Sequence, residues 1–228
     1  MATHLDDEEQ LEAIKRWWRQ NGVQIVAAVV LVIGGWYGWQ FWQDRQEQRA
    51  QEASLIYGEL VGAVAQMDEE PDAESLDRIT HYASTLKELD SDSQYARYSG
   101  LILARLAVLE GDLDAAAGEL EAVLEKAGDD PLGHIARLRL ARVEAARDNG
   151  DRALALLDVD NPGEFRALYA EARGDILAGR GDTAAARAAY ELALQNLPAS
   201  DRDARPVLEL KLNQLKPDNN AESADKEA

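Results

Sequence analysis

The sequence predicts an all-α protein in which a single N-terminal transmembrane helix is followed by an α-solenoid of about four helix pairs and a C-terminal capping helix. Three observations lead to this fold. Residues 21–43 contain no charged side chain, and from Arg45 onward the apolar residues follow a helical and not a strand period. Three Gly-Asp pairs also recur at quasi-regular spacing. The 228 residues suffice for one span and one domain with a core.

The first element is the membrane anchor. Val23 to Trp42 is 20 residues, and a helix of that length reaches about 30 Å, the thickness of a hydrocarbon core. All five tryptophans flank the apolar stretch as candidate interface anchors: Trp17, Trp18, Trp36, Trp39 and Trp42. A core helix would alternate with polar positions, and a signal peptide would end at a small-residue cleavage site. We therefore expect an uncleaved anchor.

The charges beside the span predict its orientation. Lys15, Arg16 and Arg19 precede it, whereas Arg45 and Arg49 follow it. By the positive-inside rule this bias favours a cytoplasmic N-terminus and, in a Gram-negative cell, a periplasmic C-terminal domain. The predicted segments are a short cytoplasmic segment (1–22), a transmembrane anchor (23–42), a periplasmic helical domain (43–215) and a disordered acidic tail without bulky apolar residues (216–228).

The helical domain begins with a pair of apolar-periodic helices, Ala50–Met67 and Ala73–Leu89, joined by "DEEPD". The next helices are marked by the pairs Gly111–Asp112, Gly150–Asp151 and Gly181–Asp182. Glycine can take the left-handed conformation that ends one helix, and aspartate can cap the next. The pairs lie 39 and 31 residues apart, around the period of about 34 of a tetratricopeptide repeat. We expect tetratricopeptide-like helix pairs, with an irregular helical bundle as the alternative.

The repeat units differ in how well they match the pattern. The unit 97–130 keeps small residues at Ala104 and Ala116, and the unit 136–163 is degenerate with a short second helix. The unit 167–200 fits best, with small residues where its helices must approach closely and a large one between them: Gly174, Ala186, Ala193 and Tyr190. Residues 206–215, "PVLELKLNQL", predict the amphipathic capping helix.

Composition and motifs exclude several function classes. The 43 acidic against 24 basic residues give a net charge of −19, which disfavours nucleic acid as a partner. The chain has no cysteine, and its three histidines, His4, His81 and His134, are isolated from one another. No P-loop, Gly-x-Ser-x-Gly or dinucleotide-binding pattern is present. We expect a non-enzymatic binding protein with no cofactor, no catalytic residue and no metal ligand.

Two surfaces are candidates for binding. Gly34 and Gly38 in the span would let another membrane helix approach, although glycine is common in membrane helices generally. The first helix of each repeat would line a groove for a peptide. Counted back from each Gly-Asp pair, this groove contains Tyr98, Leu101 and Arg105, then Arg137, Leu140, Glu144 and Arg147, then Leu168, Glu171 and Asp175. The alternative is that some of these residues pack against the neighbouring repeat, and we favour it for the leucines.

Five stretches together resemble the YfgM family, the ancillary subunits of the bacterial SecYEG translocon. They are "LEAIKRWWRQNG", "GWQFWQ", "LRLARV", "ARGDILAGRGDTAAARAAYELAL" and "LELKLNQL". The resemblance runs from about residue 10 to residue 215. It implies a single-span inner-membrane protein with a periplasmic tetratricopeptide-like domain. It supplies no catalytic residue, and it does not extend to the acidic tail.

The resemblance also implies partners. These are the SecYEG translocon, a membrane-anchored periplasmic chaperone of the PpiD type, and unfolded or nascent periplasmic and outer-membrane proteins. Two other functions remain open from the residues alone. The domain could be a scaffold for cell-envelope proteins of division or wall synthesis, or, with the opposite topology, a cytoplasmic signalling adaptor.

Overall fold

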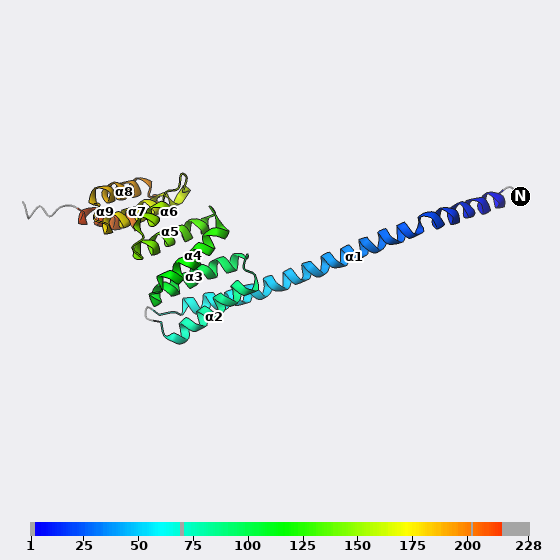
Figure 1. Cartoon of the computed structure of the whole chain (residues 1–228), viewed down its shortest axis with the longest axis horizontal. Coiled ribbons are helices and arrows are strands. Elements are labelled where there is room, and N and C mark those ends of the chain that lie inside the picture. The colour runs from blue at the N-terminus through cyan, green and yellow to red at the C-terminus, as the bar shows by residue number, and fades with distance from the viewer. Residues whose placement is uncertain (1–2, 69–70, 202, 216–228) are drawn as a thin grey trace, which may run out of the picture. The chain divides into compact units, whose positions relative to one another are not determined.

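The computed structural model describes residues 3–68, 71–201 and 203–215, and within these residues every regular element is helical (Figure 1). The predicted all-α fold is therefore confirmed. The chain divides into two compact units, Met1–Leu55 and Ile56–Ala228. The acidic tail predicted to be disordered, residues 216–228, lies outside the described residues.

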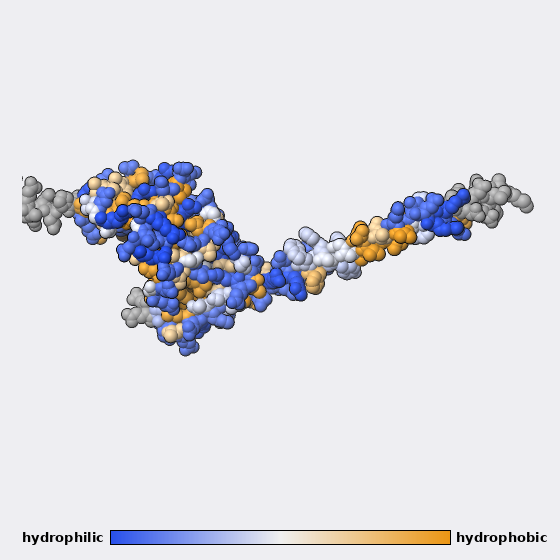
Figure 2. All heavy atoms as spheres, viewed as in Figure 1, coloured by the Kyte–Doolittle hydropathy of each residue, from blue (hydrophilic) through white to orange (hydrophobic). Residues whose placement is uncertain are grey.

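Helix α1 (Thr3–Ala65) supplies the described residues of the first unit up to Leu55, and its last residues are assigned to the second unit. Within the described residues, one helical segment, Ile14–Ala65, is long and apolar enough to cross a membrane, and only 6% of its most apolar window is buried. Figure 2 shows an orange stretch in the middle of this helix, followed by a paler one, with blue residues on either side. An apolar helix left exposed in this way suits lipid, whereas the core helix of a soluble protein is covered.

The second unit is a succession of antiparallel helices. After α1 ends at Ala65, the described elements are α2 (Ala73–Leu89), α3 (Gln94–Glu110), α4 (Leu113–Ala127), α5 (Pro131–Ala146), α6 (Gly150–Leu156), a 3₁₀ turn η1 (Gly163–Phe165), α7 (Arg166–Gly179), α8 (Thr183–Asn196) and α9 (Ala204–Gln214). From α2 to α9 each helix packs against one or more of its neighbours in the chain (Figure 1). α6 is short, as expected for the degenerate unit, and α9 is the predicted capping helix.

The core of this unit is distributed along the stack. One apolar cluster joins α3, α4 and α5 around Leu120 and Leu140. A second joins α5, α6 and α7 around Leu138 and Ile176, and a third joins α7, α8 and α9 around Leu208. α5 and α7 each contribute to two successive clusters, so each repeat is stabilised by the next one, as in a solenoid.

The predicted close approach in the last repeat is confirmed. Ala186 and Ala193 are fully buried, and Tyr190 is 3% exposed. A Cβ atom placed on Gly174 would lie 2.4 Å from Cε1 of Tyr190, which no real Cβ contact tolerates. Only glycine lets α7 and α8 meet around this tyrosine.

Two of the three Gly-Asp turns form as expected. Gly111 and Gly181 take left-handed conformations, with φ of 80° and 81°. The carboxylates of Asp112 and Asp182 accept the N–H groups three residues later, at 2.9 Å and 3.1 Å. Each aspartate also donates its own N–H to the carbonyl five residues earlier, at 2.8 Å and 3.0 Å. Both helix ends are therefore Schellman motifs followed by an N-cap.

The expectation for Gly150–Asp151 is wrong by two residues. Gly150 is already the first residue of α6, and Asp148 takes the left-handed conformation, with φ of 64°. Asn149 donates its N–H to the carbonyl of Glu144, 2.8 Å, which is the bond that Asp112 and Asp182 make in their turns. Aspartate tolerates this conformation better than most residues, so the turn forms without glycine. Positions 112, 149 and 182 are equivalent, and the repeat intervals become 37 and 33 residues.

Candidate interaction surfaces

The corrected turn changes the predicted groove on α5. A shift of two residues turns a helix by about 200°, so residues counted back from Gly150 fall on the opposite face. Leu140 and Glu144 are accordingly buried, with exposed fractions of 1% and 0%. Counting back from Asp148 instead places Arg142 at the position of Arg105 in the preceding repeat. Arg142 is exposed on α5.

Glu144 belongs to the interior ionic network of the middle repeat. Its carboxylate accepts from Arg147 and from the Asn149 amide, both at 2.7 Å, and Arg152 lies 3.3 Å away. A buried carboxylate is tolerated only when it is paired in this way. Glu144 therefore lies inside the domain, where it holds the α5–α6 turn, and not on an exposed groove.

The other predicted α5 arginines are also engaged. Arg137 donates to Asp129 at 2.8 Å. Arg147, at the end of α5, bonds Asp114 near the start of α4, and this hydrogen bond is the main cause of the raised pKa of Arg147. Both side chains tie loops and helix ends together within the stack.

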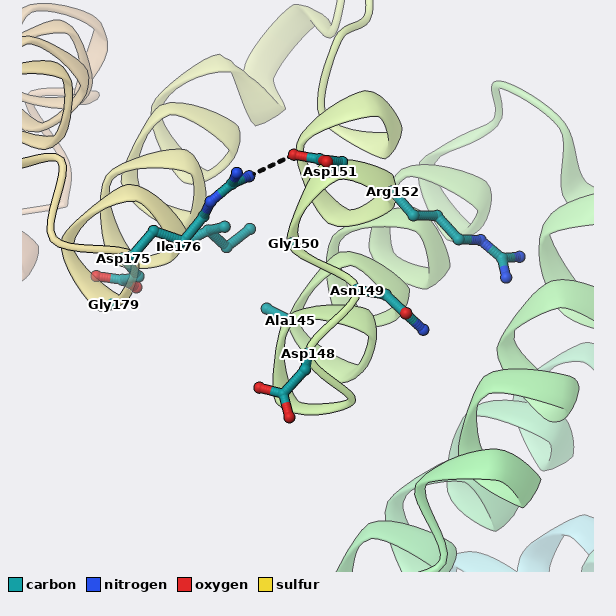
Figure 3. A pocket seen from close by; sticks show the side chains of 10 residues that line it. Ala145, Asp148, Asn149, Gly150, Asp151, Arg152, Asp175, Ile176 and Gly179 are labelled. Carbon is teal, nitrogen blue, oxygen red and sulfur yellow. Dashed lines mark hydrogen bonds and ion pairs between the residues drawn. The ribbon is translucent and has the colours of Figure 1, made fainter.

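The contact of Arg147 with Asp114 has an equivalent one repeat later. Arg180, at the end of α7, donates to Asp151 near the start of α6, at 2.6 Å. Figure 3 shows this ion pair at the edge of a hollow of about 640 Å³ between the α5–α6 turn and α7. Arg152, which also lines the hollow, is bound to Glu121 and Glu144. The two arginines of this hollow are thus already neutralised by carboxylates.

The predicted groove residues of α3 have three different environments. Leu101 is buried in the first core cluster. Tyr98 is half-buried, with its ring centroid 6.0 Å from that of Tyr57 near the end of α1. Arg105 is exposed.

The predicted α7 residues lie partly under the capping helix. Leu168 is exposed, but Glu171 and Asp175 bind Lys211 of α9 at 2.8 Å and 2.7 Å. Tyr190 also donates its hydroxyl hydrogen to Asp175, at 2.9 Å. Burial, followed by this hydrogen bond, raises the pKa of Tyr190. The two acids are therefore satisfied within the domain.

A cleft between α3 and α5 is open. It has a volume of about 240 Å³ and is lined by Ala104, Arg105, Val108, Leu120, Arg139, Arg142 and Val143. Of the three arginines that line this cleft, the groove prediction contained only Arg105. Arg142 could have been found from the repeat spacing if Asp148 had been recognised as the left-handed residue. Arg139 lies one turn before Arg142, and no sequence pattern singled it out.

The predicted packing face in the span is open on the helix surface. A Cβ atom on Gly34 or Gly38 would meet nothing within 4 Å. The five tryptophans predicted as interface anchors are all exposed, and the rings of Trp39 and Trp42 lie 5.5 Å apart. Both surfaces remain predictions as sites of packing and of membrane contact.

The buried histidine of the repeat domain is part of its packing. The ring of His134 is buried, with Nδ1 2.9 Å from the Tyr169 hydroxyl and its plane stacked 5.0 Å from Phe165. Among the residues whose placement is described, no group of three or more histidines, aspartates or glutamates is arranged to hold a metal ion. The contact of His134 with Tyr169 connects α5 to α7.

Comparison with known proteins supports the same architecture and gives the family. A model described as a tetratricopeptide repeat-like domain matches residues 15–217. Over 215 residues the chain is 30% identical to the ancillary SecYEG translocon subunit of Haemophilus influenzae, covering 94% of this chain and 100% of that protein. The Escherichia coli protein of the same name is 31% identical over 94% of this chain and 99% of its own.

A third relative of that name, from Neisseria gonorrhoeae, is 29% identical, with 95% of this chain and 100% of that protein covered. The likeness therefore includes both the apolar helix and the repeat domain. The resemblance that the sequence indicated is confirmed, and the chain belongs to the tetratricopeptide repeat-like family of ancillary SecYEG translocon subunits.

Proposed function

We propose that this chain is a single-span inner-membrane protein that associates with the SecYEG translocon and carries its helical domain on the periplasmic side. There it works with a membrane-anchored chaperone of the PpiD type on newly translocated periplasmic and outer-membrane proteins. The observation that carries this proposal is the full-length likeness to ancillary SecYEG subunits. The exposed apolar helix before the repeat domain supports the membrane location.

The proposed role is non-catalytic. The buried ionisable groups that the structure describes, such as Glu144 and His134, are held by neighbouring side chains of the fold. An anchored domain meets its partners at a local concentration in about the millimolar range, so weak contacts suffice. Binding near the channel exit, without chemistry, is enough for the role.

Co-purification with SecYEG tests the translocon proposal. Ile at Gly34 and Gly38 would block close approach of another helix, so the Gly34→Ile/Gly38→Ile variant should lose most of the SecYEG that wild-type protein retains. Ala28→Ile is the matched control, since position 28 is turned by about 100° from the glycine face. If the glycine variant retains as much SecYEG as wild type, the Gly34/Gly38 face is not the contact. If wild-type protein retains no SecYEG, the proposal is contradicted.

Cysteine labelling tests the orientation, because the chain has no cysteine of its own. Ser200→Cys, exposed between α8 and α9, should react in intact spheroplasts with a membrane-impermeant maleimide. Gln10→Cys should react only after the membrane is permeabilised. The reversed pattern would place the repeat domain in the cytoplasm.

A further inference from the structure

The cleft between α3 and α5 gathers positive charge in a chain whose net charge is −19. Arg105, Arg139 and Arg142 surround it. No carboxylate among the described residues lies within ion-pair distance of these three guanidinium groups. Arg139 makes a long hydrogen bond, 3.5 Å, to the carbonyl of Leu101. Partial desolvation of the Arg139 guanidinium, and then the repulsion of Arg105 and Arg142, lower the pKa of Arg139.

This arrangement differs from several other junctions between helices of the domain. Opposite charges link successive repeats elsewhere, as between Lys87 and Glu119, Arg97 and Asp130, and Arg180 and Asp151. At the junction between α3 and α5, arginine instead faces arginine. Like charges held together raise the free energy of the fold unless an anion from outside compensates them.

The third repeat shows how the same position is neutralised when its counter-charge is present. Arg105, Arg142 and Asp175 are equivalent, at intervals of 37 and 33 residues. Asp175 is matched by Lys211 of α9, at 2.7 Å. Arg105 has no such partner on α5, because the nearby charged groups in the cleft are Arg139 and Arg142. The missing complement at this junction is a carboxylate.

Apolar surface lies between the arginines. The cleft is lined by Ala104, Val108, Leu120 and Val143, and Val108 is 44% exposed. An apolar side chain placed there would leave water, while guanidinium forks at the rim bind carboxylates in a bidentate manner. Three arginines on two helices need more than one carboxylate, which favours acidic side chains along a segment over a single chain end.

We propose that the α3–α5 cleft binds an extended polypeptide segment in which acidic side chains flank an apolar one. This inference deepens the proposed function, on which it rests, by naming the chemistry of the polypeptide that the domain takes. A phospholipid surface is a poorer match, since the acidic domain as a whole is repelled by anionic headgroups and three arginines attract them only weakly.

Peptide binding to the full chain in phosphatidylcholine nanodiscs tests the cleft. The probe is a short synthetic peptide, blocked at both ends, that alternates Glu or Asp with Leu or Val, and its control replaces the acids with amides. Fluorescence anisotropy should show that the acidic peptide binds at least about tenfold more tightly than the amide peptide. Equal affinity for the two peptides would overturn the proposal.

Variants locate the binding. Arg105→Gln/Arg139→Gln/Arg142→Gln should lower the affinity for the acidic peptide about tenfold or more. Arg166→Gln, on an exposed arginine outside the cleft, should change it by less than about twofold. A charge reversal, Arg105→Glu/Arg142→Glu, should transfer the preference to a peptide with lysines in place of the acids. If either the triple or the reversed variant folds and binds the acidic peptide as wild type does, the proposal is overturned.

Two further measurements distinguish an internal acidic segment from other ligands of the cleft. Binding that requires a free terminal carboxylate, and is lost when the end is blocked, would assign the cleft to a chain terminus. Arginine-dependent flotation with phosphatidylglycerol vesicles, without peptide binding, would assign it to lipid. Either result contradicts an internal acidic segment.

The cleft and the translocon association can fail separately. The triple glutamine variant leaves the span unchanged, so it should co-purify with SecYEG as wild type does. Arginine-dependent peptide binding without SecYEG in the preparation would retain the cleft and reject the proposed function. SecYEG co-purification with no peptide selectivity would do the reverse.

Discussion

At the scale of single residues, the contact of Gly174 with Tyr190 sets how closely α7 and α8 approach. An added Cβ would lie 2.4 Å from the buried ring, so Gly174→Ala should cost about 1–3 kcal/mol of unfolding free energy. Gly118→Ala is the matched control: its Cβ would meet nothing within 4 Å in α4, and alanine should stabilise by up to about 1 kcal/mol. Urea unfolding followed by circular dichroism measures both. A wild-type midpoint for Gly174→Ala would contradict the packing.

Tyr169 makes the stability of the domain sensitive to alkaline pH. Burial raises its pKa to about 12, above the value of about 10 in the unfolded chain. The neutral hydroxyl therefore stabilises the fold fully below about pH 10, and this contribution is lost as the pH rises through about 12. Tyr169→Phe should therefore reduce the alkaline loss of stability measured by urea unfolding. The same alkaline loss in Tyr169→Phe as in wild type would show that the hydroxyl is not responsible.

At the scale of elements, the turns before α6 and α8 have the same backbone and different side-chain chemistry. Asp182 caps α8, so Asp182→Ala should cost about 1 kcal/mol. The Asn149 amide instead donates to buried Glu144, so Asn149→Ala should cost more, about 1.5–3 kcal/mol.

Asn149→Asp separates these roles. Aspartate is a good N-cap residue, but here it would place a second carboxylate against the fully buried Glu144. The variant should therefore be less stable than wild type in urea unfolding at neutral pH. Wild-type stability or better would mean that capping, and not the amide bond to Glu144, governs this turn.

The element scale also shows how far the sequence predicts the fold. Helical period, turn glycines and small residues sufficed for the four helix pairs, the short α6 and the Gly174 contact, because these features are local. The turn at Asp148 was missed because aspartate took a place that glycine usually takes. That two-residue error moved the predicted groove from Arg142 to Glu144. Side-chain pairing across repeats, such as Lys211 with Asp175, has no local signature, so the sequence alone could not separate engaged charges from the unpaired arginines.

At the scale of the whole molecule, the repeat unit is expected to fold without the apolar helix. The core clusters described here lie within residues 101–215 and need no residue of the span. Deleting residues 1–43 should therefore leave a monodisperse, soluble and helical domain, checked by size-exclusion chromatography with light scattering and by circular dichroism. Aggregated or strand-rich protein would contradict the independence of the repeat unit.

The most direct test of the translocon account is in-cell photo-crosslinking, with partners identified by mass spectrometry. A probe at Trp36 reports on the span, and a probe at Val108 reports on the α3–α5 cleft. A probe at Glu125, exposed on α4 outside that cleft, is the control. The account predicts SecYEG adducts from Trp36, and chaperone or newly translocated polypeptide adducts from Val108 above the control. Adducts to division, wall-synthesis or cytoplasmic proteins in their place would contradict it.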